Sequence, residues 1–319
     1  MSGNNNLFKN NVVNEHIENS QNKNIQKKGT EPLSVLNIFK KELPPLDFVF
    51  TGLKSGTIGF ISSAGGTGKS MLALHLAFSL ADTTKTYNFI PVINNSHQRG
   101  IVCYLNLEDP TEILENRIQK ISRKIIREFG EANGYKALQS IDKNLMVYGL
   151  YGKNFNLYKD GELQDKAYNI LLKLGQKSRL IIIDTFRRLH GEDENNNAKM
   201  SEILKILEEI CNKTGTTILL LHHQNKTAIL EKSNGQTAMR GASALVDNAR
   251  LLINMSVLSK DEAKELRIQE EMRKHFVKVT FAKVNYAAIP EDIYLVKGFD
   301  GVLDVCNCTE FEGDDDEIY

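Results

Sequence analysis

The sequence predicts an α/β fold in which a mostly parallel β-sheet is flanked by helices, with antiparallel strands at the C-terminal edge of the sheet. Two observations lead to this fold class. Short β-rich runs alternate with amphipathic segments, and several runs are apolar at every position, as in strands covered on both faces. A glycine-rich loop also stands between a predicted strand and a predicted helix, where phosphate-binding loops lie in such folds.

The individual elements follow from local patterns. A buried run enters the glycine turn, and a proline followed by apolar residues at helical spacing predicts a helix at Pro110. The predicted core strands are Thr57–Ser62, Ile101–Leu107, Leu180–Asp184 and Thr216–His222. The predicted core helices run from the glycine turn through about Leu80, over Pro110–Phe129 and over Lys199–Lys213. Later strands, which include antiparallel edge hairpins, are Ala249–Met255, Phe276–Asn285, Ile293–Lys297 and Val302–Val305.

Length and composition are those of a globular protein. The chain has 319 residues, 41% of them apolar and 25% charged, which excludes a wholly disordered chain and a fibre. No apolar run of about 18 residues occurs, so we expect no transmembrane helix. The start lacks the apolar stretch of a signal peptide, so we expect a cytoplasmic protein. The four cysteines are too few and too scattered for a disulfide scaffold or a four-ligand zinc site.

One domain is expected between two polar ends. Residues 1–30 are rich in asparagine and lysine and poor in large apolar side chains, which predicts a disordered arm. Residues 310–319 hold six acidic side chains and are expected to form a solvated acidic tail. Residues 31–309 contain no low-complexity break, so we expect a single domain that begins with the short helix Pro32–Lys41.

The strongest functional motif is the loop SAGGTGKS, from Ser63 to Ser70. Its glycines let consecutive backbone N–H groups surround a phosphate, and the following helix adds the positive end of its dipole. In such a P-loop, Lys69 would reach the β- and γ-phosphates of ATP and the Ser70 hydroxyl would hold Mg²⁺. The chain departs from the P-loop pattern at the first position, where Ser63 replaces the usual glycine. The alternative is a glycine-rich loop that arose by chance. The expected nucleotide contacts are Ala64, Gly65, Gly66, Thr67, Gly68, Lys69, Ser70 and Asp184.

Two acidic residues at strand ends are candidates for the chemistry. Asp184 ends the apolar run LIIID, and a carboxylate at the carboxyl end of a parallel strand faces the ligand crevice, where it can hold Mg²⁺ through water. Glu108 follows the strand IVCYLNL, a position similar to that of the glutamate that orients the attacking water in RecA-type ATPases. The alternatives are a turn-capping role for Asp184 and a helix-capping role for Glu108, although Asp109 is better placed to cap the helix.

A histidine pair ends the strand TTILLLHH. Because neighbouring strand residues point to opposite faces, His222 and His223 are not expected to bind one metal ion together. A polar residue at this strand end can contact the γ-phosphate and report its hydrolysis to the following loop. A histidine satisfied within the core is the alternative for either residue.

The 40 Lys and Arg residues balance the 40 Asp and Glu residues, so the overall charge does not indicate a nucleic-acid partner. This balance does not exclude nucleic acid, since a ring needs positive charge only along its channel. The long connection after Gln224 is either a solvated loop or a nucleic-acid contact. Its basic residues are Lys226, Lys232 and Arg240. Arg250 and Lys283 are either surface flanks or groups donated across a subunit interface.

Together these segments resemble the RecA-fold ring helicases, specifically the RepA replication helicases of IncQ-type plasmids. The likeness runs from about residue 31 to residue 306 and is carried by PPLDFVF, GTIGFISSAGGTGKSMLALHLA, LNLEDP, IIIDTFRRLHGEDENN, ILLLHH, MRGASALVDNARLLI and KVNYAA. It implies a RecA-like P-loop core, a homohexamer with ATP sites between subunits, and DNA unwinding in plasmid replication. The implied partners are single-stranded DNA and a plasmid initiator or primase, with no membrane.

The resemblance also implies roles for single residues. It assigns phosphate and magnesium to Lys69 and Ser70, the Walker B carboxylate to Asp184, the base to Glu108, the γ-phosphate sensor to His223 and the trans arginine finger to Arg250.

Lys283 matches the lysine of the K-x-R element of DnaB-type helicases, but Asn285 stands in place of its arginine, which shifts the finger role to Arg250. The segments after Asp184, with Arg187, and after His223 correspond to two loops of the central channel. The helix near residue 35 corresponds to an element that docks on a neighbouring subunit.

Two other functions remain open. One is a RecA/KaiC-like regulatory or recombination ATPase that binds DNA without unwinding it. The other is a small-molecule kinase that uses the same P-loop, although the sequence has no basic lid segment. ATPase stimulation by single-stranded DNA separates a motor from a kinase, and strand displacement separates a helicase from a recombinase.

Overall fold

The computed structural model describes residues 32–91, 93, 98–224 and 243–306. The chain divides into two compact units, Met1–Pro45 and Leu46–Tyr319. In the first unit, the short helix α1 (Val35–Phe39) carries apolar side chains that are mostly exposed. The predicted disordered arm and acidic tail lie outside the described residues.

A nine-stranded sheet forms the centre of the second unit, in the order β13-β12-β11-β10-β3-β9-β8-β4-β5. The strands from β10 to β5 are parallel, and the remaining three are added antiparallel at one edge, which confirms the predicted fold class. The parallel strands are β3 (Ile58–Ser63), β4 (Val102–Asn106), β5 (Leu145–Gly149), β8 (Leu180–Asp184), β9 (Thr217–His223) and β10 (Leu251–Val257). The antiparallel strands are β11 (Phe276–Val284), β12 (Ile293–Lys297) and β13 (Leu303–Val305).

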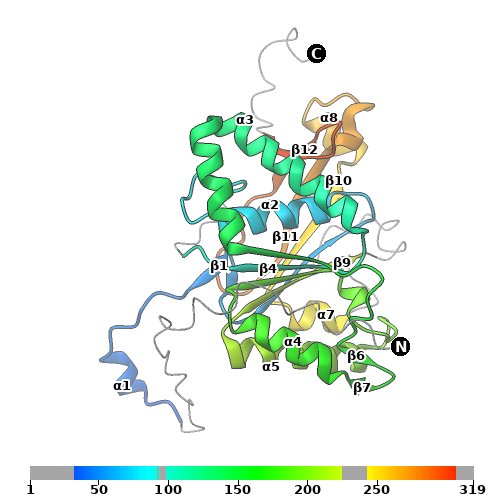
Figure 1. Cartoon of the computed structure of the whole chain (residues 1–319). Coiled ribbons are helices and arrows are strands. Elements are labelled where there is room, and N and C mark those ends of the chain that lie inside the picture. Colours follow the sequence, from blue (N-terminus) through cyan, green and yellow to red (C-terminus); the bar gives the residue numbers. More distant parts are fainter. Residues whose placement is uncertain (1–31, 92, 94–97, 225–242, 307–319) are drawn as a thin grey trace. The chain divides into compact units, whose positions relative to one another are not determined.

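Helices cover both faces of this sheet, with α2 and α3 on one side and α4, α5 and α7 on the other (Figure 1). Helix α2 is buried around almost its whole circumference because α3 packs over it, which explains the continuous apolar run MLALHLAFSL. The helices in the described part of this unit are α2 (Lys69–Ala81), α3 (Thr111–Asn144), α4 (Asp165–Gly175), α5 (Asn197–Thr214), α7 (Ser243–Asn248) and α8 (Lys260–Glu265). Among the described residues, no helix is both long and apolar enough to cross a membrane.

Short elements connect these larger ones. Two antiparallel hairpins and two 3-10 turns lie in the connections of the described chain. They are β1 (Phe48–Phe50) with β2 (Leu53–Lys54), β6 (Tyr158–Lys159) with β7 (Glu162–Leu163), η1 (Phe186–Arg188) and η3 (Met272–His275).

The predicted core elements are present with small shifts at their ends, but helix α3 is much longer than predicted. It passes a kink at Gly130 and continues to Asn144 instead of ending at Phe129. Gly130 has a φ of 73°, a left-handed conformation that glycine adopts without strain, so the chain bends there and resumes the helix. Strand β5 starts at Leu145, directly after this helix, and was not predicted because no glycine or proline separates the two.

The strand order brings the carboxyl ends of β3, β9, β8 and β4 to one edge of the sheet. Ser63 at the end of β3 pairs with His223 of β9, and Asn106 of β4 pairs with Asp184 of β8. From β3 the chain crosses two strand positions before it enters the sheet again as β4. Ligands of open parallel sheets bind at this edge, beside such a change in strand order.

The ion pair of Arg179 and Asp47 ties the segment before β8 to the segment before β1. Arg179 donates to both oxygens of Asp47, at 2.6 and 2.8 Å, and this interaction holds the pKa of the Asp47 carboxyl below its usual value. A carboxyl whose pKa is lowered by folding adds stability above its unfolded pKa, and this stability is lost as the pH falls through the folded pKa.

We therefore expect Asp47→Asn to lower the free energy of unfolding by about 1 kcal/mol at neutral pH, since the pair is partly exposed. The difference from the wild type should shrink as the pH falls below the usual range of an aspartate pKa, as measured by urea unfolding at neutral and at acid pH. The exposed Asp142→Asn is the matched control and should change neither value. A difference that persists unchanged in acid would contradict this role.

Candidate phosphate-binding and catalytic site

The loop between β3 and α2 has the geometry of a phosphate cradle. Gly66 and Gly68 have φ values of 75° and 108°, which side chains with a Cβ rarely adopt, so the turn requires glycine at both positions. A Cβ built at Gly66 would meet no atom of the described residues within 4 Å, so the loop faces open space. The Thr67 hydroxyl closes the loop by donating to the Ala64 carbonyl at 3.0 Å.

Ser63 fits at the position where the motif has its first glycine. Its side chain is fully buried, and its hydroxyl donates to the Ala64 carbonyl at 2.9 Å. Its own carbonyl accepts from the backbone N–H of Gln224 at 2.9 Å, which joins the loop to the end of β9. The departure from the motif therefore leaves the turn intact.

Lys69, the first residue of α2, lies buried beneath this loop. Burial lowers the pKa of the Lys69 amine, and the neighbouring carboxylates of Asp184 and Glu108 oppose this shift. Its Nζ lies 3.4 Å from Nε2 of His223, at the end of β9. A lysine held in this way is placed at the phosphate cradle and surrounded by groups that favour its charge.

Glu108 is positioned by the turn that follows β4. The Asn106 side chain shapes this turn, because its amide nitrogen donates to the Asp109 carbonyl at 2.7 Å and its oxygen accepts from the Asp109 N–H at 3.1 Å. Glu108 Oε2 lies 3.1 Å from His223 Nε2, and this hydrogen bond lowers the pKa of the Glu108 carboxyl. Glu108 is therefore charged near neutral pH, as an acceptor of protons must be.

Asp109 does not cap helix α3, contrary to the expectation from its place before Pro110. Pro110 is the N-cap residue of this helix, and no side chain accepts a capping hydrogen bond there. The Asp109 carboxylate instead forms an ion pair, at 2.6 Å, with Arg117 further along the helix. The long arginine side chain reaches back to Asp109 and leaves Glu108 to face the sheet edge.

The same ring nitrogen of His223 contacts both Lys69 and Glu108. A protonated Nε2 donates to the Glu108 carboxylate, whereas an unprotonated Nε2 accepts from the Lys69 ammonium, so it cannot satisfy both at once. His223 thus has two alternative partners, and a ligand that attracts Lys69 would leave it with Glu108. His222, the preceding residue, lies on the opposite face of β9 near Glu194.

Asp184 offers a carboxylate oxygen that fits a divalent cation. Its Oδ2 accepts from the Tyr104 hydroxyl at 2.7 Å, whereas Oδ1 is buried and has no hydrogen-bond partner in the described part of the chain. Burial raises the pKa of Asp184, and the hydroxyls of Tyr104 and Ser70 and the charge of Lys69 oppose this shift. An orphaned carboxylate oxygen beside the Ser70 hydroxyl is a suitable pair of oxygen donors for Mg²⁺.

Arg250 and Lys283 lie away from the phosphate cradle of their own chain. The backbone N–H of Arg250 donates to Ile58 at the amino end of β3, about 17 Å of strand from the cradle at 3.3 Å per residue. Lys283 donates to the carbonyls of Val246 and Asp247 at 2.8 and 3.0 Å, and burial and the charge of Arg250 lower its pKa. A contact between Arg250 and a γ-phosphate therefore requires the cradle of another subunit.

A polar hollow of about 730 Å³ opens at the same sheet edge. Its lining includes Glu108, His223, Arg187, Arg188 and Lys153. Arg187 is exposed in η1 and donates to the Glu192 carbonyl at 3.3 Å, so a predicted nucleic-acid contact lies in one hollow with the candidate catalytic pair. The other predicted contacts, Lys226, Lys232 and Arg240, lie outside the described residues.

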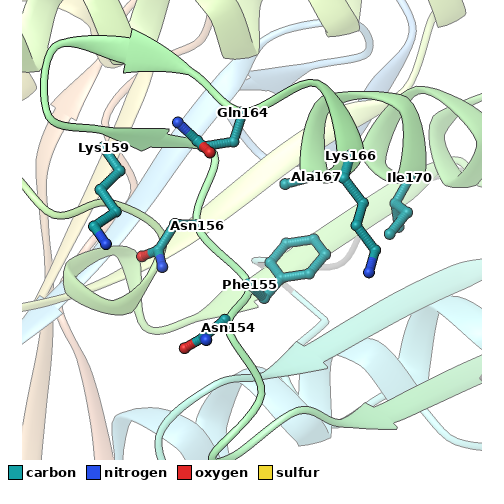
Figure 2. Close-up of a pocket in the computed structure, with 8 residues that line it drawn as sticks. All are labelled: Asn154, Phe155, Asn156, Lys159, Gln164, Lys166, Ala167 and Ile170. Carbon is teal, nitrogen blue, oxygen red and sulfur yellow. The ribbon is translucent and has the colours of Figure 1, made fainter. Parts of the chain in front are cut away.

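A smaller cavity of about 270 Å³ shares a wall with this hollow (Figure 2). The shared wall is the loop after β5, with Asn154, Phe155 and Asn156. Figure 2 shows side chains of α4 on the other side, labelled Lys166, Ala167 and Ile170. The lining of this cavity contains neither a carboxylate nor an imidazole, and its charged groups are Lys159 and Lys166.

Three residues that shape the site were not predicted from the sequence. Tyr104 and Asn106 lie within a predicted strand, and their polar side chains in an apolar run were the signal that could have found them. Lys297 of β12 donates to the Gly66 carbonyl in the cradle at 3.2 Å. This hydrogen bond joins residues that are 231 positions apart, so no local sequence pattern could predict it.

A family model described as an AAA domain matches residues 27–228, which is more than half of the chain. The chain belongs to the AAA domain family. Its structure is similar to a solved ATPase domain, with 16% identity, a TM-score of 0.51, and 79% of this chain and 85% of that chain covered. It is also similar to a DnaB-like replicative helicase described with its primase interactions, with 14% identity, a TM-score of 0.51 and 78% of this chain covered.

The chain spans 57% of the length of that DnaB-like helicase chain. At these identities the likeness concerns the fold alone, which is the RecA-like α/β core that the sequence predicted. This AAA domain thus combines such a core with a loop that has the geometry of a phosphate cradle, at the carboxyl edge of its sheet.

Proposed function

We propose that this AAA domain is an ATP-driven DNA helicase that acts in plasmid replication as a hexameric ring in the cytoplasm. In this proposal, ATP hydrolysis at the subunit interfaces drives translocation along single-stranded DNA. The observation that carries the proposal is the cluster at the sheet edge, where His223 contacts both the cradle lysine Lys69 and the carboxylate Glu108.

Each residue at this edge of the sheet has a separate role in the proposed hydrolysis reaction. Lys69 binds the β- and γ-phosphates of ATP, and the Ser70 hydroxyl and Asp184 hold Mg²⁺, which would neutralise phosphate charge when bound. Glu108 orients the attacking water and accepts its proton. When Lys69 turns to the phosphates, His223 keeps only Glu108 as a partner, so the position of His223 reports whether nucleotide is present.

The subunit interface follows from the placement of Arg250. Because Arg250 lies at the far end of its strand, it serves as the arginine finger for the cradle of the neighbouring subunit. Lys283 lies close to it and adds a second positive charge to the same surface. The exposed apolar side chains of α1 fit a helix that docks on a neighbouring subunit.

The DNA contacts come from the segment after β8 and from the connection after β9. Arg187 lies in the hollow beside Glu108 and His223. We propose Lys226, Lys232 and Arg240 as the remaining phosphate contacts. A plasmid initiator or primase is the proposed protein partner, which the likeness to a helicase described with primase supports.

Glu108→Gln should bind ATP normally and hydrolyse it about 10²–10⁴-fold more slowly, because the amide keeps the shape of the side chain but cannot accept a proton. Nucleotide binding is measured by fluorescence with a labelled ATP, and turnover by phosphate release. The matched control is Glu112→Gln, an exposed residue in the first turn of α3, which should retain full turnover. Hydrolysis by Glu108→Gln within a few-fold of the wild type would place the base elsewhere.

Unwinding of a forked DNA duplex with ATP, alongside a mass measurement of the assembly, tests the proposed function. Strand displacement by a hexamer is the expected result. ATPase activity that is stimulated by single-stranded DNA without displacement would identify a recombination or regulatory ATPase. ATP consumption that ignores DNA and phosphorylates a small molecule would identify a kinase.

A further inference from the structure

A partly buried carboxylate faces two buried imidazoles beside the proposed sensor. Glu194 lies in the connection between η1 and α5, His190 follows η1, and His222 lies in β9. One oxygen of Glu194 lies 3.9 Å from Nε2 of His190, and the other lies 3.7 Å from Nε2 of His222. The two histidine side chains are 0% and 4% exposed. Within the described residues, none of their ring nitrogens has a hydrogen-bond partner.

The charge of this cluster is carried by Glu194, which lies between the two rings. Burial opposes the charge of Glu194, but the neighbouring His222, His190 and Arg187 outweigh it, and the pKa of Glu194 is lowered. Burial lowers the pKa of His190 to about 4, so this ring is neutral at physiological pH. Each carboxylate oxygen thus faces one imidazole Nε2, just beyond hydrogen-bond distance.

The location of this cluster connects it with the catalytic pair. His222 and His223 are consecutive residues of β9 whose side chains leave opposite faces of the sheet. Glu194 therefore lies beside the end of this strand on the α5 side, while Lys69 and Glu108 contact His223 on the α2 side. His222 thus connects His223, its neighbour along β9, with Glu194 at the end of the segment that carries Arg187.

We infer that Glu194 is a positioning residue that acts through His222 to hold His223 against Glu108, and that it links the nucleotide site to the segment that carries Arg187. This inference rests on the proposed function for the role of that segment in DNA binding. The effect of Glu194 on His223 concerns ATP hydrolysis alone, so it can be tested by measuring the hydrolysis rate without DNA.

The first test measures basal ATP hydrolysis by the full-length protein without DNA. Glu194→Gln keeps the size of the side chain and removes its charge, and we expect kcat to fall about ten-fold with less than a two-fold change in ATP affinity. If Glu194 acts through His223, adding Glu194→Gln to His223→Ala should cost no further activity. A further ten-fold loss in the double variant, or wild-type turnover in Glu194→Gln, would overturn the inference.

Two further variants keep this test decisive. Asp193→Asn makes the same change of charge at an exposed position one residue away, and it should hydrolyse ATP at the wild-type rate. If Glu194→Gln does not fold, as judged by circular dichroism, His222→Asn removes the same contact from the other side. It must then show the same loss in kcat and the same lack of additivity with His223→Ala, and full activity would overturn the inference.

The second test measures the stimulation of hydrolysis by oligo-dT. Glu194→Gln should lose most of the stimulation that the wild type and Asp193→Asn show, because the link to the Arg187 segment is broken. Undiminished stimulation in Glu194→Gln would overturn the link. If oligo-dT does not stimulate the wild type, the proposed DNA function fails, and the basal double-variant comparison still decides whether Glu194 positions His223.

Discussion

Arg250→Ala subunits are expected to assemble and bind ATP but to hydrolyse it about 10³–10⁵-fold more slowly than the wild type, because arginine fingers contribute that factor where they neutralise the γ-phosphate. Arg250 lies at the amino end of β10, whereas the cradle follows the carboxyl end of β3. In the proposed function, the finger therefore comes from a neighbouring subunit. Turnover is measured by phosphate release, and the exposed Arg123→Ala on α3 serves as the matched control.

Mixed assemblies test the trans placement more sharply than the single variant. A subunit with Arg250→Ala keeps a sound P-loop, and a subunit with Lys69→Ala keeps a sound finger. When equal amounts mix at random, a complete site forms at about a quarter of the interfaces, and part of the activity should return. This recovery should vanish when each variant is cross-linked into its own assembly before mixing. Hydrolysis at the full rate by a wild-type monomer would contradict a required trans group.

Lys69→Ala is expected to abolish ATP hydrolysis and to weaken nucleotide binding severely while leaving the fold intact. The lysine supplies the positive charge at the β- and γ-phosphates, and its loss also leaves His223 with Glu108 as its contact in the cluster. The affinity for a labelled ATP and the rate of phosphate release are the measurements, with circular dichroism as the check on folding.

The matched control for this variant is Lys173→Ala, at an exposed position near the end of α4. It removes the same charge from the chain but does so away from the cradle, so ATP binding and turnover should remain those of the wild type. Wild-type turnover in Lys69→Ala would exclude the P-loop as the site of hydrolysis.

Much of the candidate site could be predicted because its signals are local. The cradle is a strand, a turn and a helix that follow one another, and the positive φ values at Gly66 and Gly68 explain why glycines stand there. Asp184 ends a strand whose other four residues are all apolar, and such a pattern places the carboxylate at the strand end. The alternation of apolar runs and amphipathic segments was likewise sufficient for the fold class, since burial on both faces requires it.

Local signals failed where two patterns meet without a break or where a contact depends on distant segments. Glycine normally predicts the end of a helix, but Gly130 lies in open space and only bends α3. Asp109 precedes a helix as a capping residue would, yet the ion pair with Arg117 uses its carboxylate instead. In both cases the local sequence allows two conformations and does not by itself decide between them.

The sequence by itself determined the phosphate loop, the strand-end carboxylates and the α/β class of this protein. The tertiary structure decided which of these residues meet. Strand β9 lies between β3 and β8, and this order alone brings His223 to Lys69, 154 residues away, and to Glu108, 115 residues away. The same order leaves Arg250 at the opposite end of the sheet and sets Glu194 behind His222. Strand order depends on which arrangement of the whole chain buries its apolar surface, and no local segment contains that information.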